Sequence, residues 1–127
     1  MEFGLSEEQV ALQDSINRFL DEQVPLDRVR KFADDPDDRG DDIWSGLAEL
    51  GVPALMIPEE HGGVGLKALD AAIVAESLGK HVTPAPFLST AILAPQALLR
   101  GGTEAQQAEL LPPVSYTHLT LPTSFLV

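Results

Sequence analysis

The segment Gly51–Leu66 constrains the fold of this chain more than any other. It reads Gly-Val-Pro-Ala-Leu-Met-Ile-Pro-Glu-Glu-His-Gly-Gly-Val-Gly-Leu and holds three glycines within four residues. An amphipathic helical pattern over 42–50 ends at Gly51, and a second helical pattern begins at the other end of the segment, at Leu66. Glycines at this density indicate a backbone that needs positive φ or a very close approach to another group. The segment therefore predicts a sharp turn between two helices.

Helix signals occur on both sides of this segment. Ser6 and Gln9 fit a capping box, as do Thr103 and Gln106. Between them we expect helices that start near residues 7, 26, 42, 66, 87 and 104, with Asp41 or Asp42 capping the third. The fourth should end at Gly79, and the last should stop at Pro112-Pro113. The first helix buries one apolar face, formed by Leu12, Ile16, Phe19 and Leu20.

The stretch Phe87–Leu99 is apolar nearly all round, which is typical of a helix that is buried or that faces a ligand on one side. Its interior Pro95 should kink it. No long alternating strand pattern and no internal repeat is present. We therefore predict an all-α fold, a helical bundle of five or six helices.

Composition narrows the classes of function. The chain has 127 residues, which suits one domain, and a net charge of −12. An acidic surface repels phosphates, so we expect no nucleic acid and no membrane as partner. The chain has no cysteine, and its N-terminus lacks a signal-peptide pattern. These features lead us to expect a cytoplasmic protein.

Several clusters hold polar residues of the types found in catalytic or metal sites. Glu59, Glu60 and His61 are adjacent, but neighbours in an extended segment point to opposite faces, so we expect a polar loop. The glycines at 62–65 match neither a Walker loop nor a dinucleotide fingerprint. The six aspartates of 34–42 lack the spacing of an EF-hand. His81 follows a helix C-terminus, where a cation is favourable. We expect no metal site and no catalytic residue here.

The order of helix, apolar run, Pro-Glu-Glu-His-Gly-Gly-Val-Gly and helix resembles the N-terminal helical domain of the acyl-CoA dehydrogenase family. The resemblance runs from about Leu5 to Pro113. It implies that the intact protein binds FAD and desaturates an acyl-CoA thioester at its α and β carbons. A glutamate base would remove the α-proton, and electrons would leave through an electron-transfer flavoprotein. The intact enzyme would be a homo- or hetero-oligomer.

The resemblance also suggests site residues. Ser89-Thr90-Ala91-Ile92 aligns with a polar-polar-Ala-Ile element beside the acyl pocket in the family. By that carry-over the candidates to line the acyl group are Leu88, Ser89, Thr90, Leu93 and Ala97. The family's flavin-contacting Thr-Glu-Pro element and its glutamate base have no match here. We therefore expect no cofactor-binding residue in this chain, no tight FAD binding and no activity of this chain alone.

The composition changes from Val114 onward, where the chain has no charge. Val-Ser-Tyr-Thr-His-Leu also resembles the translation of a sequencing-library adapter. Our hypothesis is a helical domain over 1–113 and a non-native or disordered tail over 114–127. Two other functions stay open, namely a stand-alone helical protein-interaction module and part of a flavin monooxygenase of the same fold.

Overall fold

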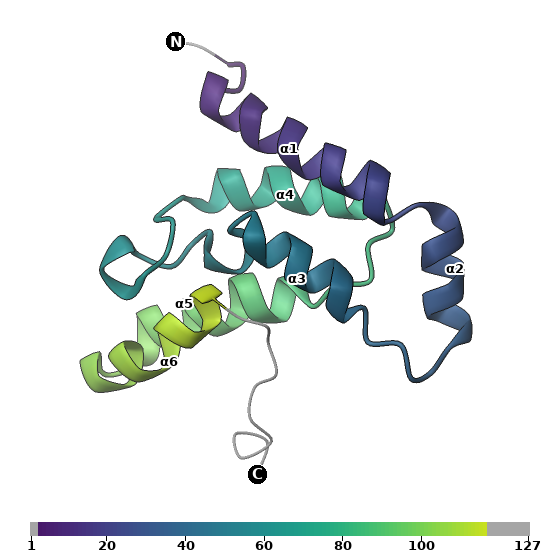
Figure 1. Ribbon diagram of the computed structural model, residues 1–127. Helices are drawn as coiled ribbons and strands as arrows, with labels where there is room; N and C mark the ends of the chain where they lie inside the picture. Colours follow the sequence, from purple (N-terminus) through teal and green to yellow (C-terminus); the bar gives the residue numbers. More distant parts are fainter. Residues whose placement is uncertain (1–2, 117–127) are drawn as a thin grey trace.

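The structure is a computed structural model that describes residues 3–116. Within these residues it is all-α, as predicted, and contains no strand (Figure 1). Its six α-helices are α1 (Glu7–Gln23), α2 (Leu26–Asp34), α3 (Asp41–Glu49), α4 (Ala68–Lys80), α5 (Ala94–Gly101) and α6 (Glu104–Tyr116). Two short 3₁₀ turns, η1 (Val52–Ala54) and η2 (Glu59–His61), follow α3, and a π-helix, η3 (Leu88–Leu93), leads into α5.

Helices α1 and α4 lie side by side and run in the same direction (Figure 1). A polar contact joins them at each end. Gln9 Nε2 donates to Asp70 Oδ1 at 3.3 Å near the two N-termini. His81 Nε2 lies 2.7 Å from Asp21 Oδ1 near the two C-termini. These two side-chain contacts, between residues far apart in the sequence, fix the register of α1 against α4.

The core forms where α1, α3 and α4 meet the start of the 87–93 segment. The predicted capping box of α1 is confirmed, since Ser6 and Gln9 exchange two hydrogen bonds of 2.9 and 3.1 Å. Among the residues of the predicted α1 face, Ile16 and Leu20 are fully buried. The large core side chains that they join are Val24, Ile43, Trp44, Leu47, Val52, Leu55, Val74, Leu78 and Phe87.

The glycine-rich segment makes the predicted turn, and it does so by bonding to itself. The backbone N–H groups of Val64, Gly65 and Leu66 donate to the carbonyls of Ala54, Ile57 and Leu55, respectively, at 2.8–3.0 Å. A β-carbon on Gly63 would overlap the backbone carbonyl of Ile57, so no larger residue fits there. Close packing against Ile57 therefore requires glycine at position 63.

Two helix ends differ from the prediction. Helix α3 is preceded by Gly40 in the left-handed conformation (φ 65°), so neither Asp41 nor Asp42 is its N-cap. The Asp38 carboxylate accepts the Gly40 N–H at 2.8 Å and holds this turn. Helix α4 continues past Gly79 to Lys80, and the left-handed residue beyond it is Val82 (φ 52°).

The predicted stop at Pro112-Pro113 is also wrong, because α6 continues to Tyr116. Proline removes a backbone donor and disfavours a helical residue before it. Packing outweighs that cost here: Leu111 and Val114 are buried in a small cluster with Ile57. The predicted second capping box is confirmed at the start of α6, where Thr103 and Gln106 exchange two hydrogen bonds. Of the proposed tail over 114–127, residues 114–116 form the end of α6, whereas the rest, with His118, lies outside the described residues.

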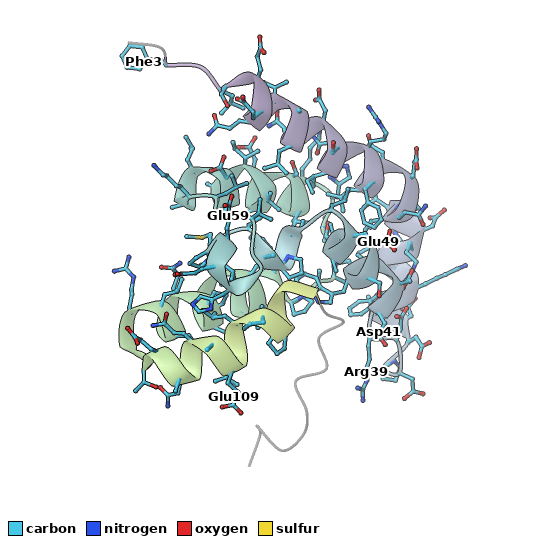
Figure 2. All side chains as sticks on the ribbon, turned by 60° about the vertical axis from the view of Figure 1, so that its left-hand side comes forward. Phe3, Arg39, Asp41, Glu49, Glu59 and Glu109 are labelled. Carbon is cyan, nitrogen blue, oxygen red and sulfur yellow. The ribbon has the colours of Figure 1, made fainter. Side chains whose placement is uncertain are left out.

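Charged side chains lie on the outside of the bundle. Figure 2 shows Arg39, Asp41, Glu49 and Glu109 pointing away from the ribbon, and all four are exposed. Among residues 3–116 no helix is both long and apolar enough to cross a membrane.

Candidate functional site

Four of the predicted site residues lie on η3, which joins the core to α5, and the fifth, Ala97, lies in α5. Leu88 and Leu93 are 61% and 58% exposed, which is unusual for leucine in an apolar segment. Ser89 and Ala97 are exposed and Thr90 is half-buried, whereas Ala91 between them is fully buried. The segment thus turns one side into the core and offers its other side outward.

A π-helix, not the expected simple kink, precedes Pro95. The Ala94 N–H donates to the carbonyl of Ser89, five residues back. Pro95 has no backbone N–H and cannot donate the i→i−4 hydrogen bond of an α-helix. The chain accommodates this missing bond in the widened turn that precedes Pro95. Pro95 itself then lies buried in the first turn of α5. Single π-turns of this kind occur often at functional sites.

The widened turn decides which side chains share a face. In an α-helix, residues three or four apart are neighbours, and residues five apart point to different sides. The i→i+5 turn of η3 lies between Leu88 and Leu93, and Ala97 follows in the regular α-helix α5. We call these three exposed apolar side chains the 88–97 stripe.

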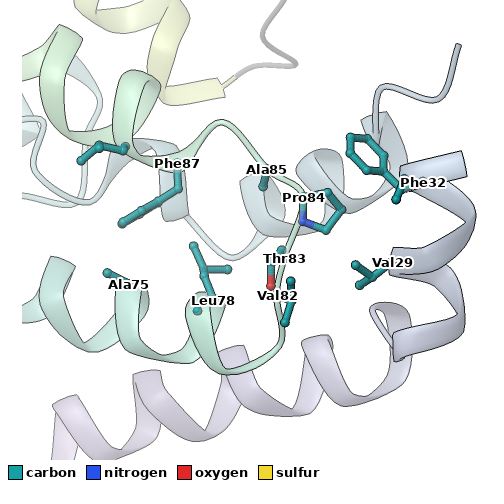
Figure 3. A pocket seen from close by; sticks show the side chains of 12 residues that line it. Val29, Phe32, Ala75, Leu78, Val82, Thr83, Pro84, Ala85 and Phe87 are labelled. Atoms are coloured by element: carbon teal, nitrogen blue, oxygen red, sulfur yellow. The ribbon is translucent and has the colours of Figure 1, made fainter. Parts of the chain in front are cut away.

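At its Leu88 end the stripe meets an open groove of about 600 Å³ (Figure 3). The groove lies between α2, the C-terminal end of α4 and the connection 82–88. None of the described residues that line the groove is charged. Its single side-chain hydroxyl, on Thr83, is buried and has no hydrogen-bond partner among the described residues. The residues that form the groove are Val29, Phe32, Ala33, Ala75, Leu78, Gly79, Val82, Thr83, Pro84, Ala85, Phe87 and Leu88. We call it the 82–88 groove.

Val82 on the groove has a strained backbone. The N–H groups of Val82 and Thr83 donate to the carbonyls of Gly79 and Leu78, at 3.1 and 3.0 Å. This pair of bonds is the Schellman ending of a helix, in which the left-handed position is usually glycine. Val82 is β-branched and has φ 52°, a conformation that costs such a residue about 1–2 kcal/mol. The sequence pattern predicted Gly79, and not Val82, as the left-handed residue at the end of this helix. The segment reads Gly-Lys-His-Val, so its glycine lies three residues before the left-handed position.

The glycine-rich loop offers no phosphate site. Phosphate loops present free backbone N–H groups to the anion. Here the N–H groups of Gly62, Gly63, Val64 and Gly65 all donate to carbonyls of 54–59. The glycine-rich loop therefore does not fit the pyrophosphate of FAD.

The other polar candidates are structural. Glu59 and Glu60 are exposed, and the contact of His61 with Glu60 is 3.9 Å long. No group of three or more metal-ligating side chains occurs in the described part of the chain. His81 contacts the carbonyl of Ser77 at 2.8 Å as well as Asp21, so it links the end of α4 to α1.

The aspartate-rich loop is organised by Arg28. Its guanidinium binds Asp38 and Asp42, each at 2.8 Å. The hydrogen bond from Arg28 to Asp42, followed by the one to Asp38, raises the pKa of the guanidinium further. The Gly40 N–H, followed by Arg28, lowers the pKa of the Asp38 carboxyl. Through Arg28, Asp38 and Asp42 tie α2 to the start of α3, so we interpret these two acids as structural and not as ligands of a metal ion.

Comparison with known proteins identifies the fold and the family. The family model described as acyl-CoA dehydrogenase, N-terminal domain, matches residues 6–116. The crystal structure of the ChsE4-ChsE5 complex from Mycobacterium tuberculosis matches with a TM-score of 0.70 at 23% identity, over 91% of this chain and 29% of that one. At this identity the structural likeness shows the fold alone.

Two curated relatives extend the match. The acyl-CoA dehydrogenase IpdE2 of Mycolicibacterium smegmatis is 35% identical over 79% of this chain and 32% of its own length. The (2S)-methylsuccinyl-CoA dehydrogenase of Cereibacter sphaeroides is 37% identical over 95% of this chain and 22% of its own length. The chain thus spans between about a fifth and a third of the length of these relatives. It belongs to the acyl-CoA dehydrogenase family, whose N-terminal domain it carries.

Proposed function

We propose that this chain is the N-terminal domain of an FAD-dependent acyl-CoA dehydrogenase, and that its 88–97 stripe lines the acyl group of the substrate. The family match over residues 6–116 supports the enzyme class. The observation that supports the role of this domain is the exposure of the apolar side chains of Leu88, Leu93 and Ala97 on η3 and α5. Ser89 and Thr90, also on η3, add hydroxyl groups that can orient the polar part of the acyl group.

The chemistry itself is assigned to parts of the protein beyond this chain. The glycine-rich loop spends its N–H groups internally, and no residue here matches the family's glutamate base. We therefore expect this chain alone to be inactive and to bind FAD weakly or not at all. Electrons from the intact enzyme would pass to an electron-transfer flavoprotein. The ChsE4-ChsE5 structure is a complex of two named chains, and it supports an oligomeric assembly for the intact protein.

The test is made on the protein encoded by the complete genomic reading frame that contains this sequence. A dehydrogenase would purify with FAD, and its flavin would bleach when an acyl-CoA is added without an electron acceptor. A protein that carries no flavin would refute the proposal. The isolated chain of 127 residues serves as the control and should bind no stoichiometric FAD.

The second candidate is a stand-alone interaction module. It is favoured by the exposed leucines of the stripe, since contiguous exposed apolar surface often marks a contact with another protein. A genuine stop codon directly after residue 127 at the genomic locus would support it. A reading frame that continues into a flavin-binding domain would exclude it.

A further inference from the structure

We propose that α2 is a movable wall of the 82–88 groove, which detaches from the domain while α1, α3 and α4 stay folded. Val29 and Phe32 of α2 face Val82 and Pro84 across the groove (Figure 3). Opening of α2 therefore uncovers the other wall, which the end of α4 and the connection 82–88 form. This movement is independent of the proposed function. Sparse packing of α2, one ion pair that holds it and one unsatisfied hydroxyl in the groove support it.

Helix α2 is packed more sparsely than its neighbours. None of its nine residues is buried, whereas α1, α3 and α4 each bury at least two. Its first apolar residue, Leu26, is 57% exposed, and Figure 1 shows α2 at the edge of the molecule. A helix of this length is marginal in water without packing, so α2 also loses helical hydrogen bonds when it detaches.

The two ends of the segment that carries α2 are anchored. Val24, just before it, is 2% exposed and belongs to the core. Gly40, just after it, is buried and has φ 65°, and a β-carbon there would lie 3.0 Å from the carbonyl oxygen of Pro84. Residues 25–39 between these two points can therefore move without displacing the core.

A single side chain ties α2 to another helix. Arg28 binds Asp42, in the first turn of α3, and Asp38, in the connecting loop, each at 2.8 Å. Among residues 3–116 no other hydrogen bond or ion pair joins α2 to another helix, and Arg30 pairs with Asp27 of α2 itself. The Asp42 side chain is 65% exposed, so this tie is weak and sensitive to salt.

The closed groove also contains a polar group without a partner. Thr83 lines the groove together with Val29 and Phe32, and its Oγ1 is buried with no hydrogen-bond partner among the described residues. A buried hydroxyl without a partner costs free energy, which is regained when water reaches it. Water that enters as α2 opens can bind this hydroxyl. Thr83 thus favours the open form, whereas Arg28 favours the closed one.

Hydrogen exchange of the whole 127-residue chain, followed by NMR, measures this opening. We expect the amides of residues 30–34 in α2 to be at least about tenfold less protected than those of α1 and α4, because they exchange through local opening. Added salt should widen this difference by weakening the contact between Arg28 and Asp42. Equal protection in the three helices would show that α2 opens only with the whole domain, and would overturn the proposal.

Three variants test the tie and the hydroxyl. Arg28→Gln should lower the protection of α2 about fivefold and leave that of α1 and α4 unchanged. Arg30→Gln is the matched control and should change it little, since Arg30 pairs within α2. Thr83→Val removes the unsatisfied hydroxyl and should raise the protection of α2 at least about fivefold. Equal effects of Arg28→Gln and Arg30→Gln, or unchanged or lower α2 protection in Thr83→Val, would contradict the proposal.

Discussion

The Nε2 atom of His81 lies 2.7 Å from Oδ1 of Asp21, a residue 60 positions earlier in the chain. The imidazole is largely covered, with 11% of its side chain exposed, whereas the carboxylate is 72% exposed. The contact joins the C-terminal ends of two helices that run in the same direction. It holds the end of α4, from which the chain turns through Val82 into the site.

This contact predicts a small but measurable coupling. Alanine substitutions of Asp21 and His81 should interact in a double-mutant cycle by about 0.2–1 kcal/mol of unfolding free energy, because the carboxylate is exposed. Urea unfolding of the four proteins measures it. Glu22 forms no ion pair among the described residues, so Glu22→Ala should be additive with His81→Ala. Additivity of Asp21→Ala with His81→Ala would show that the contact contributes nothing.

Two glycines should respond in opposite directions to alanine. Gly63→Ala places a β-carbon against the Ile57 carbonyl and should lower the free energy of unfolding by about 1–3 kcal/mol. Gly79→Ala meets no atom within 4 Å in α4 and should raise it by about 0.5–1 kcal/mol. Denaturation midpoints measured side by side decide this. Equal effects of the two substitutions would contradict the packing described for the loop.

Val82→Gly should stabilise the domain. It removes the left-handed strain of a β-branched residue, and we expect a gain of about 1 kcal/mol in the free energy of unfolding. Val10, also exposed but within α1, is the control: Val10→Gly should cost up to about 1 kcal/mol. A loss of stability in Val82→Gly would mean that the valine side chain contributes more packing than its exposure indicates.

The aspartate loop predicts a dependence on pH. The pKa of Asp38 is lowered in the folded state by the Gly40 N–H and by Arg28, so the ionised carboxylate favours folding. That contribution is complete above the ordinary pKa of 3.8 and is lost as the pH falls through the lower folded value.

The check is a comparison of stability between pH 7 and pH 3. Asp38→Asn should be less stable than the unsubstituted chain at the upper end, and the difference should narrow as the pH falls below 3.8. Asp37, whose side chain makes no hydrogen bond among the described residues, is the control, and Asp37→Asn should change little. A constant gap between Asp38→Asn and the unsubstituted chain across this range would contradict the shift.

The sequence predicted those parts of the fold that depend on neighbours along the chain. Both capping boxes, the buried face of α1 and the glycine turn follow from local spacing, and all are observed. Two errors at helix ends have different causes, the first a local one and the second a contact distant in the sequence. Gly40 replaces Asp41 or Asp42 as the N-cap because Asp38 holds that turn, and α6 continues past two prolines because Val114 is buried.

The candidate site was predictable only in part. The resemblance pointed to Leu88, Ser89, Thr90, Leu93 and Ala97, and their lining of an acyl group stays a prediction. The π-turn that carries Leu88, Ser89, Thr90 and Leu93 lies just before Pro95, and periodicity counted at 3.6 residues per turn does not anticipate it. The 82–88 groove is built from α2 and from residues 75–88, which are distant from α2 in sequence, so no local pattern could indicate it.

The most direct test of the central claim is photolabelling of the complete enzyme with an acyl-CoA that carries a diazirine in its acyl chain. After irradiation and digestion, tandem mass spectrometry locates the labelled residue. The account predicts label on Leu88, Leu93 or Ala97, which an excess of unlabelled acyl-CoA suppresses. Label confined to α1, α2 or α6, with none between residues 82 and 97, would contradict it.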